Sequence, residues 1–319
     1  MAIGDKAGLK MGQATRDAFG DALKDLGATH PEIVTVDGDV GNSTRTEVFA
    51  HAFPDRAFQV GIAESNLVGV GGGLAANGKT PVVASFAVFL LCNAYEQIRM
   101  SVAFPAMNVK LVGSHAGISI GEDGPSQMGI EDVALACSFP GMTVIVPCDA
   151  PSTKKATAAM IEHHGPTYLR LGRPKVAVVY SDGCNFEIGK AITVREGSDV
   201  TVIANGLMVA MALDAAAELA ETGISARVLD MHTAKPLDEE AIVKAARETG
   251  ALVVAEEHLA HGGLGSAVAM VVGQTIPVPM AYVNLGDRYA ESGDAEGLLE
   301  KYGLTSSAIV EAVRRVVRR

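Results

Sequence analysis

The sequence predicts an α/β protein of two domains. The chain has 319 residues, and because domains of about 150 residues are typical, two domains are expected. Apolar residues make up 48% of the chain and charged residues 20%, which is enough apolar side chain for substantial cores and excludes a disordered protein. Short apolar runs alternate with helical segments throughout, a pattern typical of parallel sheets covered by helices.

The first domain is expected over residues 1–180. Its predicted strands are apolar and buried, and they cover residues 33–36, 57–60, 81–86, 109–114, 143–147 and 167–171. Its predicted helices cover residues 15–26, 63–76, 90–103, 129–138 and 151–163. Residues 172–185 contain Pro174, Ser181, Asp182 and Gly183, and this composition indicates the exit from the domain.

The second domain is expected over residues 188–319 and is smaller. Its predicted strands cover residues 200–204, 225–229, 252–255 and 280–284. Its predicted helices cover residues 208–222, 238–248, 266–273 and 306–318. Asp238 stands where an N-cap is needed, and a Gly-rich turn at residues 261–265 precedes the third helix.

Charge and cysteine content restrict the partners and the compartment. The formal net charge of −11 gives no electrostatic reason to bind nucleic acid or an anionic membrane, so neither is expected as a partner. No segment is predicted to span a bilayer. The four cysteines form no C-x-x-C motif, which favours reduced thiols in the cytoplasm over disulfides or a thiolate zinc site.

Two motif-like segments favour structural explanations. Residues 71–76 (GGGLAA) match a dinucleotide fingerprint, but they lie inside a predicted helix, which favours close helix packing. Residues 37–42 (DGDVGN) resemble a motif that holds Mg²⁺ and a diphosphate, but they lack its long spacer. No metal ligand is therefore expected in this chain.

Three loops are candidates for the functional site because each follows a predicted strand, where ligands bind in α/β sheets. They cover residues 37–44, 61–66 and 115–125, and Phe86 and Phe89 follow a further strand. Glu64, at a helix start near these aromatic residues, suits the binding of a flat nitrogen heterocycle. It equally suits a first-turn acid stabilised by the helix dipole, and the spacing alone leaves both open.

Four segments together resemble the thiamine-diphosphate-dependent transketolase family. They are residues 58–66 (FQVGIAESN), 81–89 (PVVASFAVF), 114–125 (SHAGISIGEDGP) and 169–174 (LRLGRP). Residues 231–238 (MHTAKPLD), 256–258 (EEH) and the Gly-rich 262–265 resemble the family's C-terminal domain. The resemblance covers essentially the whole chain and implies a pyrimidine-binding domain followed by a smaller C-terminal domain.

The resemblance also implies a missing part. Single-chain family members begin with a further domain that carries the diphosphate and metal ligands. This chain therefore resembles the C-terminal subunit of a split transketolase, whose active site is shared with an N-terminal subunit in an α2β2 assembly. The implied cofactors are thiamine diphosphate and Mg²⁺ or Ca²⁺, with the metal ligands on the partner.

Roles follow from the matching positions. Glu64 matches the glutamate that hydrogen-bonds N1′ of the cofactor's aminopyrimidine and so activates it. Phe86 and Phe89 match aromatic residues of the pyrimidine pocket, with Phe89 the better candidate for stacking, and Asp39 matches an acidic residue at the interface near the cofactor.

On the substrate side, the resemblance implies transfer of a two-carbon ketol unit between sugar phosphates. Asp123 matches the aspartate that recognises a donor hydroxyl, and with Glu64 and His115 it forms the catalytic set. The residues matching the phosphate-binding set are Arg16, Ser43, His115 and Arg173.

Three departures from the family pattern concern the substrate more than the cofactor. Gln127 stands where the family usually has histidine, Cys92 where many members have tyrosine, and Ala63 where many have arginine. The alternatives are an enzyme similar to 1-deoxyxylulose-phosphate synthase, a 2-oxoacid dehydrogenase β-type subunit, or a non-catalytic regulatory subunit.

Overall fold

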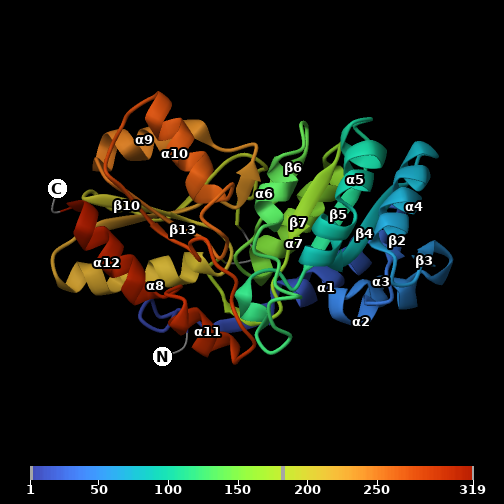
Figure 1. Ribbon diagram of the computed structural model, residues 1–319, viewed down its shortest axis with the longest axis horizontal. Helices are drawn as coiled ribbons and strands as arrows, with labels where there is room; N and C mark the ends of the chain where they lie inside the picture. The colour runs from blue at the N-terminus through green and yellow to red at the C-terminus, as the bar shows by residue number, and fades with distance from the viewer. Residues whose placement is uncertain (1–2, 181–183, 318–319) are drawn as a thin grey trace.

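A computed structural model describes residues 3–180 and 184–317. Ser181, Asp182 and Gly183 of the expected connection and Arg318 of the expected last helix lie outside the described residues. Two α/β units lie side by side, each built on a sheet with helices on both faces (Figure 1). This confirms the predicted fold class.

The first sheet has seven strands in the order β12-β6-β7-β5-β4-β2-β3. Their bounds are β2 (Ile33–Asp37), β3 (Ala57–Gln59), β4 (Thr80–Phe86), β5 (Lys110–Ser114), β6 (Thr143–Ile145), β7 (Thr167–Arg170) and β12 (Thr233–Lys235). All pair in parallel except β12, which is antiparallel to β6 and comes from the chain after the second unit has begun. The prediction that residues 57–60 are buried is wrong, because β3 is the edge strand and is partly exposed.

Helices cover both faces of this sheet. On one face lie α1 (Thr15–Gly27), α3 (Thr46–Ala52) and α7 (Ala150–Glu162), and on the other α4 (Glu64–Ala76), α5 (Tyr95–Ile98) and α6 (Asp132–Cys137). The helix predicted over residues 90–103 is not one regular helix, because wide π-type turns flank α5 on both sides. The helix predicted from residue 129 begins only at Asp132.

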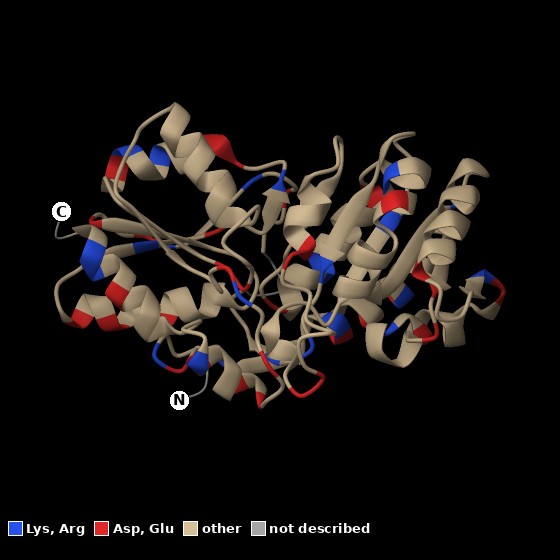
Figure 2. Ribbon diagram, viewed as in Figure 1, with Lys and Arg blue, Asp and Glu red and all other residues tan. Residues whose placement is uncertain are grey.

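Two glycines of helix α4 are required by close packing. A Cβ on Gly71 would lie 2.4 Å from Val83 on β4, and one on Gly72 would lie 2.7 Å from the carbonyl oxygen of Ser101. Such distances are far inside van der Waals contact, so only glycine allows the helix to approach the sheet and its neighbour this closely. The packing interpretation is therefore confirmed for Gly71 and Gly72, but not for Gly73, where a Cβ would have no neighbour within 4 Å. Helix α4 also carries a single charged residue, Glu64, at its first position (Figure 2).

The second sheet has five strands in the order β14-β13-β10-β11-β9. Their bounds are β9 (Ile192–Arg195), β10 (Val200–Ala204), β11 (Ala226–Asp230), β13 (Leu252–Ala255) and β14 (Met280–Val283). Helices α8 (Met208–Glu221) and α12 (Ser306–Val317) cover one face, and α9 (Glu239–Thr249) and α10 (Leu264–Gln274) the other (Figure 1). Asp238 caps α9 as predicted, since its Oδ1 accepts a hydrogen bond from the Ala241 N–H at 3.0 Å.

Several short elements were not predicted. Strands β1 (Met11–Ala14) and β8 (Lys175–Ala177) form a two-stranded antiparallel sheet, so the expected exit segment contains a strand. Helices α2 (Gly41–Thr44) and α11 (Ala295–Lys301) and the antiparallel β9 are further additions. Within the described parts of the chain, no helix has both the length and the apolarity needed to cross a membrane.

Candidate active site

The candidate loops converge because their strands are neighbours. Strands β5, β4, β2 and β3 lie next to one another in parallel, so their carboxyl ends share one edge of the first sheet. This edge therefore gathers Phe86 with the loops of residues 37–44, 61–66 and 115–125. The prediction that these loops form one region is confirmed.

Glu64 is a buried carboxylate that keeps unused hydrogen-bonding capacity. It opens α4 and is 9% exposed. Ser85 Oγ donates to its Oε1 at 3.4 Å and Asn93 Nδ2 to its Oε2 at 3.5 Å. Both hydrogen bonds are long, and a carboxylate can accept about four. The side chain is thus able to accept a stronger hydrogen bond from a ligand.

Three aromatic rings lie nearly parallel at the carboxyl end of β4, the strand whose Ser85 donates to Glu64. The Phe86 and His115 centroids are 4.0 Å apart with an interplanar angle of 9°. The Phe86 and Phe89 centroids are 5.6 Å apart with an angle of 8°. Stacking at these separations is favourable and limits how each ring can turn. Phe86 therefore restricts the ring of His115. Phe86 is the last residue of β4, and Phe89 follows it by three residues.

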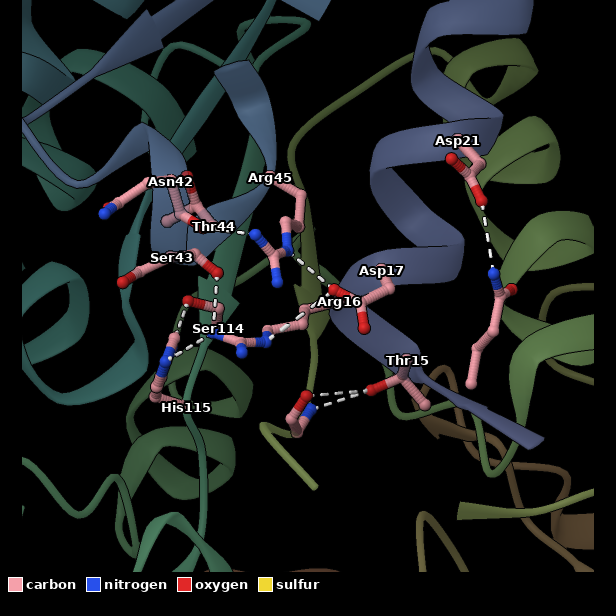
Figure 3. Close-up of polar contacts among 12 residues, drawn as sticks. Thr15, Arg16, Asp17, Asp21, Asn42, Ser43, Thr44, Arg45, Ser114 and His115 are labelled. Atoms are coloured by element: carbon pink, nitrogen blue, oxygen red, sulfur yellow. Dashed lines mark hydrogen bonds and ion pairs between the residues drawn. The ribbon is translucent and has the colours of Figure 1, made fainter. Parts of the chain in front are cut away.

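His115 is neutral and has one defined tautomer. Its Nε2 lies 2.9 Å from Arg16 Nη1, and its Nδ1 lies 2.8 Å from Ser114 Oγ (Figure 3). A guanidinium has only donors, so Nε2 accepts and Nδ1 carries the proton. Burial, reinforced by the charges of Arg16, Arg173 and Arg45, lowers the pKa of His115 to about 3.

Arg16 connects helix α1 to the loop after β2. Its Nη1 also donates to the Ser43 carbonyl oxygen at 3.1 Å (Figure 3). Its buried Nε has no hydrogen-bond partner and lies 4.0 Å from Asp17 Oδ1 in an ion pair. Burial, followed by the charge of Arg45, lowers the pKa of Arg16. Arg45 itself donates from Nε to Asp17 Oδ1 at 2.6 Å. Sequence reasoning missed Arg45, although it directly follows a candidate loop.

Backbone strain concentrates in the same loops. Among the described residues, four other than glycine have positive φ, and three of these are Asp39 (φ 67°), Arg45 (φ 68°) and His115 (φ 57°). The left-handed region is costly for residues with a Cβ, and such conformations cluster at functional sites. The tertiary structure thus holds the loops in place against a local preference.

Arg173 lines a pocket and contacts Asp123. Arg173 Nη1 donates to the Ile120 carbonyl oxygen at 2.8 Å and lies 3.5 Å from Asp123 Oδ1. Arg16 and Arg173 line this pocket together with two acidic residues, Glu122 and Asp294. Of the predicted phosphate set, Arg16 and Arg173 line this pocket, whereas Ser43 and His115 contact Arg16 without lining it. Asp123 forms an ion pair with Arg173.

The two aspartates of the loop after β2 have different environments. Asp39 is exposed, and its N–H donates to Gln59 Oε1 at 2.7 Å. Asp37 is buried and accepts hydrogen bonds from Val40 N–H and the Thr46 hydroxyl, both at 2.8 Å. Asp37 therefore shapes the loop. Within residues 3–180 and 184–317, no group of three or more His, Cys, Asp or Glu could hold a metal ion.

The fold and this edge define an α/β protein that has, along one sheet edge, a pocket lined by two arginines, a buried carboxylate and stacked aromatic rings. The pyrimidine-binding domain of transketolase matches residues 11–178, and the transketolase C-terminal domain matches residues 189–309. The chain belongs to the transketolase family, which implies dependence on thiamine diphosphate. This confirms the resemblance found in the sequence.

Relatives of known description support the same placement. A 6-deoxy-6-sulfo-D-fructose transketolase subunit of a Clostridium species is 43% identical, over 95% of this chain and 94% of that protein. An apulose-4-phosphate transketolase subunit from Phocaeicola vulgatus is 37% identical, over 96% of this chain and 98% of that protein. Human transketolase is 41% identical over 99% of this chain, which spans 50% of the human protein. A solved split-gene transketolase, described as an inactive β4 tetramer, is 47% identical with a TM-score of 0.90 over 96% of this chain and 99% of that one.

Proposed function

We propose that this chain is the C-terminal catalytic subunit of a transketolase-type enzyme that transfers a two-carbon ketol unit from a ketose phosphate to an aldose phosphate. The carrying observation is that one edge of the first sheet holds both Glu64, with its unused acceptor capacity, and the pocket that Arg16 and Arg173 line. The first group suits the cofactor and the second suits a phosphate.

The site is completed by an N-terminal subunit, in an α2β2 assembly, that holds the diphosphate and a Mg²⁺ or Ca²⁺ ion. Two facts support this: the chain spans half of human transketolase, and the similar split-gene transketolase is described as inactive in its β4 form. On this proposal residues 1–180 form the pyrimidine-binding domain and residues 188–319 the C-terminal domain. Four cysteines without a C-x-x-C motif support a cytoplasmic location.

Glu64 is the residue of this chain that acts on the cofactor. Thiamine diphosphate, when bound, supplies the carbon nucleophile of ketol transfer. Glu64 accepts a hydrogen bond from the protonated ring nitrogen, for which its two long contacts leave capacity. Phe86 and Phe89 form the wall for the flat ring, and the exposed Asp39 faces the partner subunit.

The sugar phosphate is bound in the pocket that Arg16 and Arg173 line. Arg16 and Arg173 neutralise the phosphate, with Ser43 and His115 beside it, and Asp123 accepts a hydrogen bond from a donor hydroxyl. Because the pKa of His115 is about 3, this side chain stays neutral and orients Arg16 through its Nε2. A neutral, fixed imidazole serves binding and alignment rather than proton uptake.

The test is ketol transfer from xylulose 5-phosphate to ribose 5-phosphate with thiamine diphosphate and Mg²⁺. It is run on this chain alone and mixed with a transketolase N-terminal subunit from the same source. Activity only in the mixture is expected. Activity of the chain alone would contradict the shared site and return attention to residues 37–42.

The donor is best established with a panel. Two similar subunits are named for different sugars, a sulfofructose and apulose 4-phosphate, so both belong in it. Pyruvate is included because its decarboxylation would favour the alternative enzymes. Thiamine diphosphate binding by the mixture without any transfer would favour a regulatory subunit.

A further inference from the structure

The loop that carries His115 and Asp123 is packed against the second domain. Ile118 and Ile120 are buried in the same apolar cluster as Met208 and Leu298, which belong to α8 and α11. Figure 1 shows α11 beside this part of the chain. The loop thus has its ends in the candidate active site and its middle in the core of the other domain.

Glu257 is the charged group at the centre of this contact. It follows β13, is 5% exposed, and its Oε1 accepts the Ser119 N–H at 2.6 Å. A Cβ on Gly117, whose φ is +83°, would lie 2.1 Å from the Glu257 carboxyl carbon. The carboxylate therefore lies directly against the backbone of two loop residues, one by a hydrogen bond and one by packing.

The first domain in turn holds the backbone of Glu257. Arg170 Nη2 donates to the Glu257 carbonyl oxygen at 2.9 Å and to the Gly129 carbonyl oxygen at 3.0 Å. Arg170 Nε forms an ion pair with the fully buried Asp132 at 2.8 Å. Glu257 is thus fixed at both its backbone and its carboxylate. Through its carboxylate it fixes the position of the Ser119 N–H.

We propose that Glu257 is a positioning residue for the active-site loop, acting through the Ser119 N–H and the Gly117 backbone on His115 and Asp123. This inference rests on the proposed function only for its kinetic consequence. A buried carboxylate that accepts a backbone N–H makes a charge-assisted hydrogen bond, stronger than a neutral one and more demanding in geometry. The C-terminal domain thereby shapes a pocket to which it contributes no phosphate ligand.

The adjacent Glu256 offers a matched control. It is 2% exposed, and its two carboxylate oxygens accept the N–H groups of Leu264 and Gly265 at 2.7 and 2.8 Å. It therefore stabilises the start of α10 within its own domain and makes no hydrogen bond to the loop. Glu256→Gln tests the loss of a buried charge at the same depth, without touching the loop.

The first experiment compares steady-state kinetics of the reconstituted enzyme. Glu257→Asp keeps the charge but withdraws the carboxylate by one methylene, whereas Glu257→Gln keeps an acceptor oxygen at the original reach. We expect Glu257→Asp to raise the donor KM about tenfold with kcat changed much less, and Glu257→Gln to remain within about threefold. Glu256→Gln should keep the wild-type KM even where it lowers the Tm. A wild-type KM in Glu257→Asp would overturn the proposal.

The second experiment needs no activity. Hydrogen exchange of the chain, measured for the segment of residues 116–121, should accelerate about tenfold in Glu257→Asp and remain near wild type in Glu257→Gln and Glu256→Gln. Unchanged exchange in Glu257→Asp would overturn the positioning role. If the wild-type mixture transfers no ketol unit while this exchange pattern holds, the proposed function fails and the positioning role stands.

Discussion

The two sheets present the same kind of edge and use it differently. In the first sheet, the carboxyl ends of β2, β4 and β5 lead to the candidate active site. In the second, the carboxyl ends of β10, β11 and β13 are turned onto the first domain. The Gly206 N–H after β10 donates to Val146, the His232 carbonyl after β11 accepts from Val146, and Glu257 after β13 binds Ser119.

This difference shows that the carboxyl edge of a parallel sheet is a place for protruding loops, which a ligand or another domain can occupy. At the first edge, the loops hold strained non-glycine residues, and Arg16 and Arg173 line a pocket. At the second edge the polar groups are buried at the domain boundary, as with Asp230, whose Oδ2 accepts the Tyr180 hydroxyl at 2.7 Å. Substitutions at the first edge should therefore change activity. Those at the second edge should change stability, except at Glu257, whose contact with Ser119 reaches the active-site loop.

The largest expected effect is at Glu64. Glu64→Gln keeps the size and an acceptor oxygen but removes the carboxylate that shares a proton with the cofactor. We expect kcat of the reconstituted enzyme to fall about 10³-fold, within the range for general acid–base groups. Because its protein contacts are long, the Tm should change little. Glu162→Gln, on the surface at the end of α7, serves as the control. A kcat near wild type in Glu64→Gln would remove Glu64 from the catalytic set.

The second effect concerns stability at the inward-facing edge. Burial raises the pKa of Asp230 to about 7, and the neighbouring Asp149 adds to this. The pKa of an aspartate in the unfolded chain is about 3.9. Between this pH and about 7, the folded chain therefore keeps a proton on Asp230 that the unfolded chain has lost. The stabilisation is therefore fully present below about pH 4 and is lost as pH rises to about 7.

Asp230→Asn tests this directly, since the amide oxygen still accepts from Tyr180 but cannot ionise. The difference in free energy of unfolding, variant minus wild type, should become more positive as pH rises from about 4 to about 8, by at most about 4 kcal/mol. Denaturant titrations at both pH values measure it, with the exposed Asp25→Asn as control. Ketol transfer should be unchanged. A difference between variant and wild type that does not depend on pH would contradict the raised pKa.

Much of the fold could be predicted because its signals are local. The strand predicted over residues 252–255 matches β13, and α4 was placed within one residue, since each is a distinct apolar run or periodic segment. The clustering of the candidate loops also followed from local information. Once strands and their order along the chain are expected to form a parallel sheet, the loops at their carboxyl ends must share an edge.

What could not be predicted depends on distant partners. Strand β12 is three residues long, and its partner β6 lies about 90 residues earlier, so no local pattern marks it. The left-handed backbone of Arg45 and His115 is equally invisible, because both are ordinary side chains imposed on a strained conformation by the tertiary structure. Glu257 belonged to a recognised motif, but its contact with Ser119 becomes visible only in three dimensions.

The smallest expected effect is at His115 and bears on how the first edge works. With a pKa of about 3, His115 remains neutral across the range in which enzymes are assayed. His115→Asn removes the acceptor for Arg16, so kcat/KM should fall about tenfold, by the same factor at every pH from about 5 to about 9. The pH profiles of kcat/KM should therefore have the same shape in wild type and in His115→Asn. The control His164→Asn, at an exposed position, should match wild type at every pH. A limb near about pH 6.5 that disappears in His115→Asn would instead make His115 a proton-transfer group. The residues around Arg16 would then take part in proton transfer as well as in binding. The two sheet edges would differ in chemical role, and not only in whether a ligand or a domain covers them.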